Sequence, residues 1–352
     1  MTLHFMLPPP HRCSIAADIR PVRLRVIARL VLASLFIVLQ SCQSDLMLQS
    51  QEVAYTSEAQ GELLDQLGPE SKVIAKTRSG QRVEILERIN RWNRVRVMTA
   101  DTNEGGANNA APPLEGWMHQ RQMVSAAVFE QFQKLAADSR ELPLQGKALV
   151  RRLANMRFRP GRTTQVFYQL AADEKVEALR HDVATREPTA DDIRRGVSNP
   201  IPEDWLLVRA SENRTGWVLE TFIELVPPME VARYRESQRI RAWFEIYKEH
   251  VGDQIHPWYL WATVPKSVGL VHDFEEIRVL VWNPAASRYE TSYRERNLKG
   301  FMPIHVSMET RPEGVSPSFN FEHENSQGQR VARRYYMIGR QVRLERATTD
   351  RP

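Results

Sequence analysis

Short runs in which apolar and polar residues alternate make up most of the chain after residue 53. Val83–Leu86 and Trp92–Met98 alternate with a period of two and are rich in β-branched residues, a pattern that predicts half-buried strands. Val176–Leu179 and Trp205–Arg209 repeat this pair of runs further along the chain. The hydrophobic pattern therefore predicts two strand-rich modules of the same kind.

One segment between the two modules has a helical period instead. In Ala126–Ala137, the residues Val128, Phe132 and Leu135 recur at positions i, i+4 and i+7, which places them on one face of a helix. Ser125 precedes the run and is a suitable N-cap because its hydroxyl can accept a hydrogen bond from the first helical turn. We expect a short helix that joins the modules.

The residues after the second module alternate again. Ile240–Tyr247 and Ile277–Trp282 have a period of two, Pro257–Val264 is aromatic and strand-like, and further short strands follow. Closely spaced short strands favour an antiparallel β-sandwich or barrel. The predicted fold class is therefore mostly β: two small β-barrels joined by a short helix, plus a C-terminal antiparallel β-sandwich or barrel.

Each module carries the same tryptophan and glycine signature. Trp92–Arg96 has the form W-x-x-V-R and is followed by Gly116–Met118, while Trp205–Arg209 is followed by Gly216–Val218. The second module also has an N-x-R-x-x-P turn that begins at Asn155. Both modules resemble the bacterial SH3-like domain (SH3b, or SH3 type 3). The resemblance implies two SH3-like barrels, in which a glycine allows a close or positive-φ turn before the last long strand.

The resemblance also suggests where a ligand would bind. SH3-like barrels of this kind hold peptides, often peptides of peptidoglycan, in a shallow groove. Trp92, Trp205 and Tyr168 are the candidate wall of this groove, since an amphipathic ring can lie half exposed. Alternatively, Trp92 and Trp205 pack the edge of each barrel. We expect Trp117 and Trp217 to fill the barrel cores.

Two long loops interrupt the modules and are the natural lids of such a groove. They are Thr99–Leu114 and Asp182–Asp204.

The pattern divides the chain into six expected segments. They are a lipoprotein signal peptide (1–41), a tether (42–52), the first module (53–125), a helical linker (126–147), the second module (148–226) and the C-terminal domain (227–352).

The N-terminal segment has the pattern of an export signal. Five arginines precede the apolar run Leu30–Leu39. This run has the size of a signal-peptide core and is too short to span a bilayer as a helix. Ser41 and Cys42 follow it and resemble the lipobox of bacterial lipoproteins. That resemblance makes Cys42 the lipid-attachment residue. The alternative is an ordinary secretory signal with an unrelated cysteine.

The export signal and Cys42 together predict that the protein is located in the cell envelope. A lipid on Cys42 would hold the protein at a membrane, facing the periplasm. Gln43 stands where enterobacterial lipoproteins retained at the inner membrane carry aspartate, so the outer membrane is favoured. The expected partners are this membrane and either peptidoglycan or an envelope protein.

Charge and cysteine content narrow the function further. The chain has a net charge of +5, but five arginines and only one acidic residue lie before Cys42, so most of the excess belongs to the targeting segment. We therefore expect no nucleic-acid partner. Cys13 and Cys42 are the only cysteines, which leaves the folded part without a disulfide, a thiol nucleophile or a thiolate metal site.

No combination of residues indicates catalysis. His250, Asp253 and His256 do not supply three or four convergent metal ligands, and the adjacent acidic pairs Asp191–Asp192 and Glu275–Glu276 point to opposite faces if they lie on strands. G-x-S-x-G, H-E-x-x-H and Walker motifs are absent from the sequence. The expectation is a protein that is not an enzyme and has no cofactor, no metal and no catalytic residue.

The functional hypothesis is a non-catalytic, lipid-anchored binding protein of the cell envelope that contacts peptidoglycan or its peptides through the SH3-like modules. The alternative is a protein-assembly scaffold or spacer of the envelope that has no cell-wall ligand.

Overall fold

The structure is a computed structural model that describes residues 52–57, 61–97, 113–312 and 314–345. The predicted signal peptide, Cys42 and most of the tether lie outside the described residues, as does nearly all of the predicted loop Thr99–Leu114. Among the described residues, no helix is long and apolar enough to cross a membrane.

The first module is a seven-stranded antiparallel sheet in the order β3-β2-β6-β5-β4-β1-β7. Leu63, Val83, Val95 and Met118 alternate into its interior and are fully buried, as the period of two predicts. Its elements are β1 (Glu52–Thr56), β2 (Gly61–Leu64), β3 (Val73–Thr77), β4 (Arg82–Ile89), β5 (Trp92–Val97), β6 (Leu114–His119), η1 (Gln120–Gln122) and β7 (Met123–Ser125).

The second module repeats this sheet strand by strand, in the order β10-β9-β13-β12-β11-β8-β14. A short 3-10 helix again precedes the last strand. Its elements are β8 (Gly146–Val150), β9 (Ala154–Arg157), β10 (Val166–Leu170), β11 (Lys175–Arg186), β12 (Ile201–Arg209), η2 (Ser211–Asn213), β13 (Thr215–Leu219), η3 (Glu220–Phe222) and β14 (Ile223–Leu225). The mostly-β prediction is confirmed, and the shared strand order extends the repeat beyond the tryptophan signature.

The predicted helix joins the modules as α2 (Ala126–Asp138). Ser125 caps it, with its hydroxyl accepting a hydrogen bond from the Val128 N–H. Phe129 stacks on Tyr55 of β1 at 3.9 Å between ring centroids and meets Phe167 of β10 edge to face at 5.6 Å. The helix therefore packs aromatic rings against both modules.

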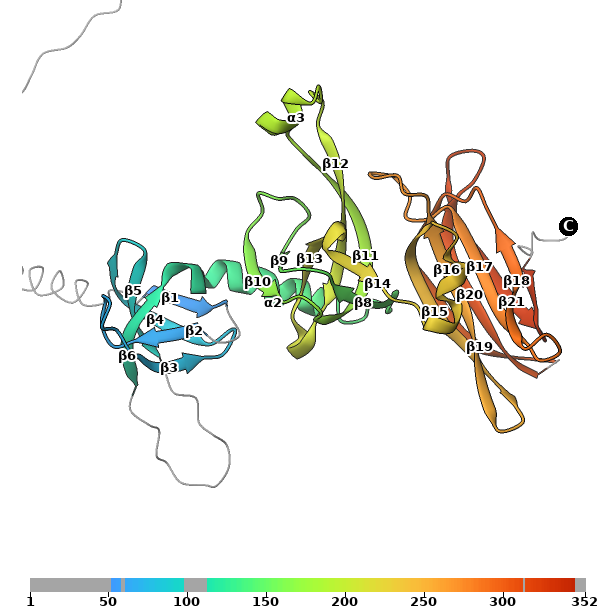
Figure 1. The fold of residues 1–352 in the computed structure, drawn as a ribbon, viewed down its shortest axis with the longest axis horizontal. Helices are drawn as coiled ribbons and strands as arrows, with labels where there is room; N and C mark the ends of the chain where they lie inside the picture. The colour runs from blue at the N-terminus through green and yellow to red at the C-terminus, as the bar shows by residue number, and fades with distance from the viewer. Residues whose placement is uncertain (1–51, 58–60, 98–112, 313, 346–352) are drawn as a thin grey trace, which may run out of the picture. The chain divides into compact units, whose positions relative to one another are not determined.

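The segment Asp182–Asp204 is not the loop that the sequence predicted. β11 and β12 remain paired along it, from Val183 opposite Asp204 to Arg186 opposite Ile201, and α3 (Ala190–Arg194) lies at the tip. Figure 1 shows this long hairpin, here called the arm, projecting from the second module. Its polar residues pair with one another: Arg186 contacts Glu203 at 3.0 Å, which holds the strands together.

The C-terminal domain consists of two four-stranded antiparallel sheets that face each other (Figure 1), as a sandwich requires. Ala262, Val279, Phe319 and Tyr335 fill the core between them. The first sheet contains β15 (Arg239–Val251), β16 (Gln254–Val264), β17 (Glu276–Asn283) and β18 (Arg288–Glu295), and the second contains β19 (Gly300–Arg311), β20 (Gly314–Glu324), β21 (Arg330–Ile338) and β22 (Gln341–Leu344). A connecting segment with α4 (Met229–Ala232) and η4 (Arg233–Arg235) precedes it.

The expectation that tryptophans fill the barrels is wrong. Successive side chains on a strand point to opposite faces, so buried Met118 and Val218 occupy the interiors. Trp117 is half buried on the outer face of its module. Trp217 is 7% exposed, but it lies in a separate apolar cluster on the outer face of the second module with Trp205 and its neighbours.

Candidate functional site

The aromatic residues predicted to line a groove do not form one. Trp205 is 1% exposed and Tyr168 is 8% exposed, because α2 covers them: Leu135 packs on the cluster around Trp205 and Phe132 meets the Tyr168 ring edge to face. The packing interpretation of Trp205 therefore holds in this structure, and neither ring offers a surface to a ligand.

Trp92 differs from this pair. It is half buried at the start of β5, on the first module, whereas Trp205 and Tyr168 belong to the second. Its ring meets the His119 imidazole edge to face at 5.1 Å. Trp92 can still contact a partner, but without a neighbouring aromatic wall from the other two residues.

One member of each acidic or histidine pair noted in the sequence makes a structural contact. Asp192 accepts hydrogen bonds from Arg186 and from Thr189, whose side chain caps α3. Glu276 is held by Arg294 at 2.8 Å. The His256 ring stacks on Trp282 at 4.0 Å.

A mostly buried group of charged side chains, here called the junction cluster, joins the second module to the C-terminal domain. Its members come from β11, β12 and η3 on one side and from β15 and the segment before β17 on the other. They are His181, Asp204 and Glu220 from the second module, with Arg239, Arg241 and Asp273 from the C-terminal domain. Three cationic and three anionic groups thus face each other when His181 is protonated.

His181 lies between two carboxylates. Its Nδ1 is 2.7 Å from Asp273 Oδ1 and its Nε2 is 3.1 Å from Asp204 Oδ1, while the side chain is 1% exposed. Burial opposes protonation, but the hydrogen bonds to both carboxylates outweigh it and raise the pKa of His181. The geometry therefore favours the imidazolium, which donates a proton to each side.

Asp204 contacts all three cationic groups of the cluster. Burial alone would raise its pKa, but His181 and Arg241 outweigh burial and hold the pKa of Asp204 well below its usual range. The backbone N–H of Gly269 donates to the same carboxylate at 3.1 Å. Arg239 Nη2 reaches the other carboxylate oxygen at 3.2 Å.

Arg241 is the most deeply buried member. It has 0% exposure, and its guanidinium lies 2.6 Å from Glu220 and 3.3 Å from Asp204. Its N–H groups are nevertheless not directed at an acceptor with hydrogen-bonding geometry, so Arg241 contributes charge neutralisation more than directed bonds. Burial outweighs both arginines at Glu220 and raises the pKa of that carboxyl.

Three members of the cluster resemble a metal-ligand set. His181, Asp204 and Glu220 place possible ligand atoms within 4.8 Å of one another, and Asp273 would orient the histidine as metal sites often require. However, Arg241 already contacts both carboxylates. A divalent cation would meet this guanidinium and unbalance a cluster that is neutral without it. We therefore interpret the junction cluster as a structural ion network.

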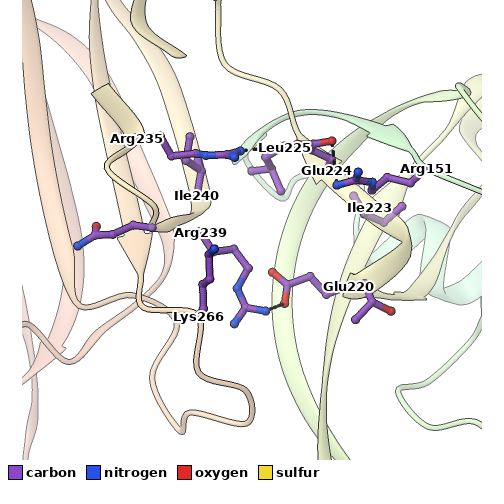
Figure 2. A pocket seen from close by; sticks show the side chains of 11 residues that line it. Arg151, Glu220, Ile223, Glu224, Leu225, Arg235, Arg239, Ile240 and Lys266 are labelled. Atoms are coloured by element: carbon purple, nitrogen blue, oxygen red, sulfur yellow. Dashed lines mark hydrogen bonds and ion pairs between the residues drawn. The ribbon is translucent and has the colours of Figure 1, made fainter. Parts of the chain in front are cut away.

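A cleft of about 380 Å³ opens beside the junction cluster. Figure 2 shows its side chains converging from the second module on one side and from the C-terminal domain on the other. Ile223, Leu225 and Ile240 are buried beneath it and supply apolar surface. Four basic and two acidic side chains line it: Arg151, Arg235, Arg239 and Lys266, with Glu220 and Glu224.

We call this cleft the junction cleft. Its acidic side chains do not neutralise all of its basic side chains. Glu220 is already paired with Arg239 at 2.9 Å and belongs to the balanced junction cluster. Glu224 is shared by Arg151 at 3.2 Å and Arg235 at 3.6 Å. Lys266 makes no ion pair within the described part of the chain. Two positive charges are therefore in excess.

No local sequence motif indicates this site. Asp204 lies 23 residues from His181, and Asp273 lies 92 residues from it. The cleft draws its basic residues from η4 and β15 and from the segments that follow β8 and β16. Only the packing of the second module on the C-terminal domain brings these residues together.

Comparison with known proteins does not place the chain in a family. No protein-family model matches it, and no curated protein does. Among solved structures, NlpC2 from Trichomonas vaginalis is 10% identical, with 84% of this chain and 96% of that chain covered and a TM-score of 0.16. NlpC1 from Trichomonas vaginalis is 9% identical, with 85% and 92% covered and a TM-score of 0.16. An NlpC/P60 family protein from Bacillus cereus ATCC 10987 is 10% identical, with 80% and 93% covered and a TM-score of 0.22.

Proposed function

We propose that the protein is a non-catalytic, lipid-anchored binding protein of the cell envelope, and that its ligand binds in the junction cleft. The anchor and the address rest on the sequence, in which the apolar run Leu30–Leu39 is followed closely by Cys42. The observation that carries the binding function is the junction cleft itself, which combines an excess of basic side chains with an apolar floor.

Peptidoglycan or its peptides are the proposed ligand. Peptides of the cell wall carry free carboxylates beside short aliphatic side chains, and both features complement the junction cleft. Arginine is well suited to carboxylates because its planar guanidinium can donate two parallel hydrogen bonds. The aromatic groove expected from the sequence is not needed for this function, since Trp205 and Tyr168 lie beneath α2.

The junction cluster supports a binding role over a catalytic one. His181 is the natural acid–base candidate, but both of its ring nitrogens are hydrogen-bonded to carboxylates and its side chain is 1% exposed. A general base needs hydrogen-bond reach to the proton of a substrate. His181 instead serves to hold the two walls of the junction together.

Co-sedimentation with insoluble peptidoglycan tests the proposal. The full chain in a non-ionic detergent should sediment with peptidoglycan, and Lys266→Ala together with Arg151→Ala should reduce the sedimented fraction. Lys134→Ala is the matched control, because Lys134 is an exposed lysine on α2 that does not line the cleft. Sedimentation no greater than that of an unrelated protein would exclude peptidoglycan as the ligand.

A scaffold for protein assembly is the second candidate, and the arm favours it. The arm extends beyond the barrel of the second module and carries Ile193, which is 60% exposed, and Val197, which is 40% exposed, near its tip. Affinity purification from membranes should then recover a stoichiometric partner that is lost with Ile193→Asp. Trp205→Ala is a poor test, because Trp205 is buried and its truncation would destabilise the module.

A further inference from the structure

We propose that the junction cleft recognises a dicarboxylate: a small peptide or amino-acid derivative with two carboxylates separated by a short apolar segment. This inference rests on the proposed function and specifies its ligand. It follows from the positions of the two excess charges, which lie in separate parts of the cleft, with apolar side chains between them (Figure 2).

The first position is the pair of arginines around Glu224. Arg151 and Arg235 have side chains that are 61% and 48% exposed and share this one carboxylate, which is 39% exposed itself. Each guanidinium has five N–H donors, so one shared carboxylate leaves donors of both arginines for a ligand. A carboxylate that enters here would neutralise the excess charge of this position.

The second position is Lys266. Its ammonium makes no ion pair with any described residue, and it is exposed at the rim of the cleft. In Figure 2 it lies beside Arg239, toward the lower end of the cleft, whereas Arg235 lies at the upper end. Arg239 is occupied by Glu220 and Asp204, so Lys266 is the free charge of this position. An ammonium binds a carboxylate as a point charge without demanding one orientation.

The surface between the two positions is apolar. Ile223 and Ile240 are 7% and 4% exposed, and both line the cleft. A ligand with a short aliphatic segment would cover this surface and gain from its removal from water. A compact inorganic anion such as phosphate would occupy one position only and leave the apolar floor wet. The volume of about 380 Å³ lies within the range of small-molecule sites.

Calorimetric titration of the full chain in a non-ionic detergent, at low ionic strength, tests the inference. The probes are acetyl-alanyl-glutamate with two carboxylates, acetyl-alanyl-glutamine with one, the amide of acetyl-alanyl-glutamine with none, and inorganic phosphate. We expect each lost carboxylate to weaken binding by about twofold to fivefold, the range of an exposed ion pair. Phosphate should bind no better than the singly charged peptide.

Lys266→Ala locates one of the two contacts. In this variant acetyl-alanyl-glutamate should bind no more tightly than acetyl-alanyl-glutamine, while Arg235→Ala should weaken both. Lys134→Ala should leave the full order of the probes unchanged. Equal binding of the charged probes to the unmodified chain, or an unchanged preference for the dicarboxylate in Lys266→Ala, would overturn the inference.

The two proposals can fail separately. If the dicarboxylate binds with the expected dependence on Lys266 but the protein does not sediment with peptidoglycan, the ligand class stands and the cell-wall function falls. If the protein sediments with peptidoglycan and Lys266→Ala has no effect on sedimentation or on the probes, the cell-wall function stands and the dicarboxylate site is refuted.

Discussion

The side-chain amide of Gln145 and the backbone of Ile304 exchange two hydrogen bonds. The Ile304 N–H donates to Gln145 Oε1 at 2.9 Å, and Gln145 Nε2 donates to the Ile304 carbonyl at 3.2 Å. The backbone N–H of Gln145 donates to the Ala178 carbonyl, and its own carbonyl accepts from the Trp243 N–H. One residue of the linker thus connects β11 of the second module with β15 and β19, one strand from each sheet of the C-terminal domain.

Replacing this amide should destabilise the junction. Gln145 has 0% exposure, so Gln145→Ala would leave the N–H and C=O of Ile304 buried without partners. Each such group costs about 1–3 kcal/mol, and we expect a loss of about 2–4 kcal/mol of unfolding free energy in urea titrations. Gln133→Ala, on the exposed face of α2, is the control. A loss for Gln145→Ala no larger than for the control would show that the two bonds are not formed.

The protonation of His181 should make stability fall at alkaline pH. The folded-state pKa of His181 is raised, so its contribution is complete below the unfolded value of about 6.5 and is lost as pH rises through the folded value. Asp204 and Asp273 stabilise the charge, whereas Arg241 opposes it. The unfolding free energy should decline as the pH rises above about 6.5 and through the folded-state pKa of His181, by at most about 1.4 kcal/mol per pH unit for one proton.

The origin of this decline can be tested by substitution. His181→Gln removes the titrating group, so this variant should be less stable at pH 6 and should lose the part of the slope that His181 causes. His305→Gln changes an exposed histidine on β19 and should keep the slope. A slope that persists unchanged in His181→Gln would assign the pH dependence to other groups.

The sequence pattern predicted the strands and the helix better than the faces of the strands. The period of two located β4, β5, β11 and β12, and the helical period located α2. The pattern failed at β13, where all five residues from Thr215 to Leu219 are buried. Because both faces of this strand are covered, its apolar residues form a continuous run, and such a run does not reveal which side chains point inward. The pattern therefore does not predict which face of β13 carries Trp217, and the expectation that a tryptophan fills a small barrel does not hold there.

The candidate site could not be predicted from sequence, for a different reason. The contacts of His181 and Arg241 join strands that are paired with other strands in their own sheets, so their spacing along the chain follows no motif. The arm was misread because its composition is polar. Its charged residues pair across the hairpin, as Arg186 and Glu203 do, whereas composition alone does not distinguish paired charges from solvated ones.

The glycine before each tryptophan should be required for close packing. A Cβ at Gly116 would lie 2.6 Å from the Leu64 carbonyl oxygen and 2.7 Å from Leu63 Cγ, and one at Gly216 would lie 2.3 Å from Met156 Cγ. Overpacking of this kind costs about 1–3 kcal/mol, so Gly116→Ala and Gly216→Ala should each lower the unfolding free energy by that amount. The steric clash in Gly116→Ala should be harder to relieve than the clash in Gly216→Ala, because the atom closest to the new Cβ at Gly116 is a backbone oxygen.

Thermal unfolding followed by near-ultraviolet circular dichroism would measure the effect of both glycine substitutions. Ala137→Gly, which changes one side-chain atom near the end of α2, gives a control for an alanine–glycine exchange outside the barrels. If either variant unfolds at the same temperature as the unmodified chain, the strands separate easily enough to admit a methyl group. Close packing would then not be the reason that glycine occupies these positions.

The membrane anchor is predicted from the apolar run Leu30–Leu39 and from Cys42, which follows it, and removal of this cysteine should release the protein. Each buried methylene of an acyl chain contributes about 0.8 kcal/mol to membrane binding, so losing the attachment site in Cys42→Ser should move the chain from the membrane fraction to the soluble fraction and abolish labelling with a fatty-acid probe. Cys13→Ser is the matched control, because Cys13 precedes the predicted cleavage point, and it should change neither result. If Cys42→Ser and Cys13→Ser fractionate in the same way, the lipoprotein interpretation is wrong. The predicted attachment to a membrane would then have no support.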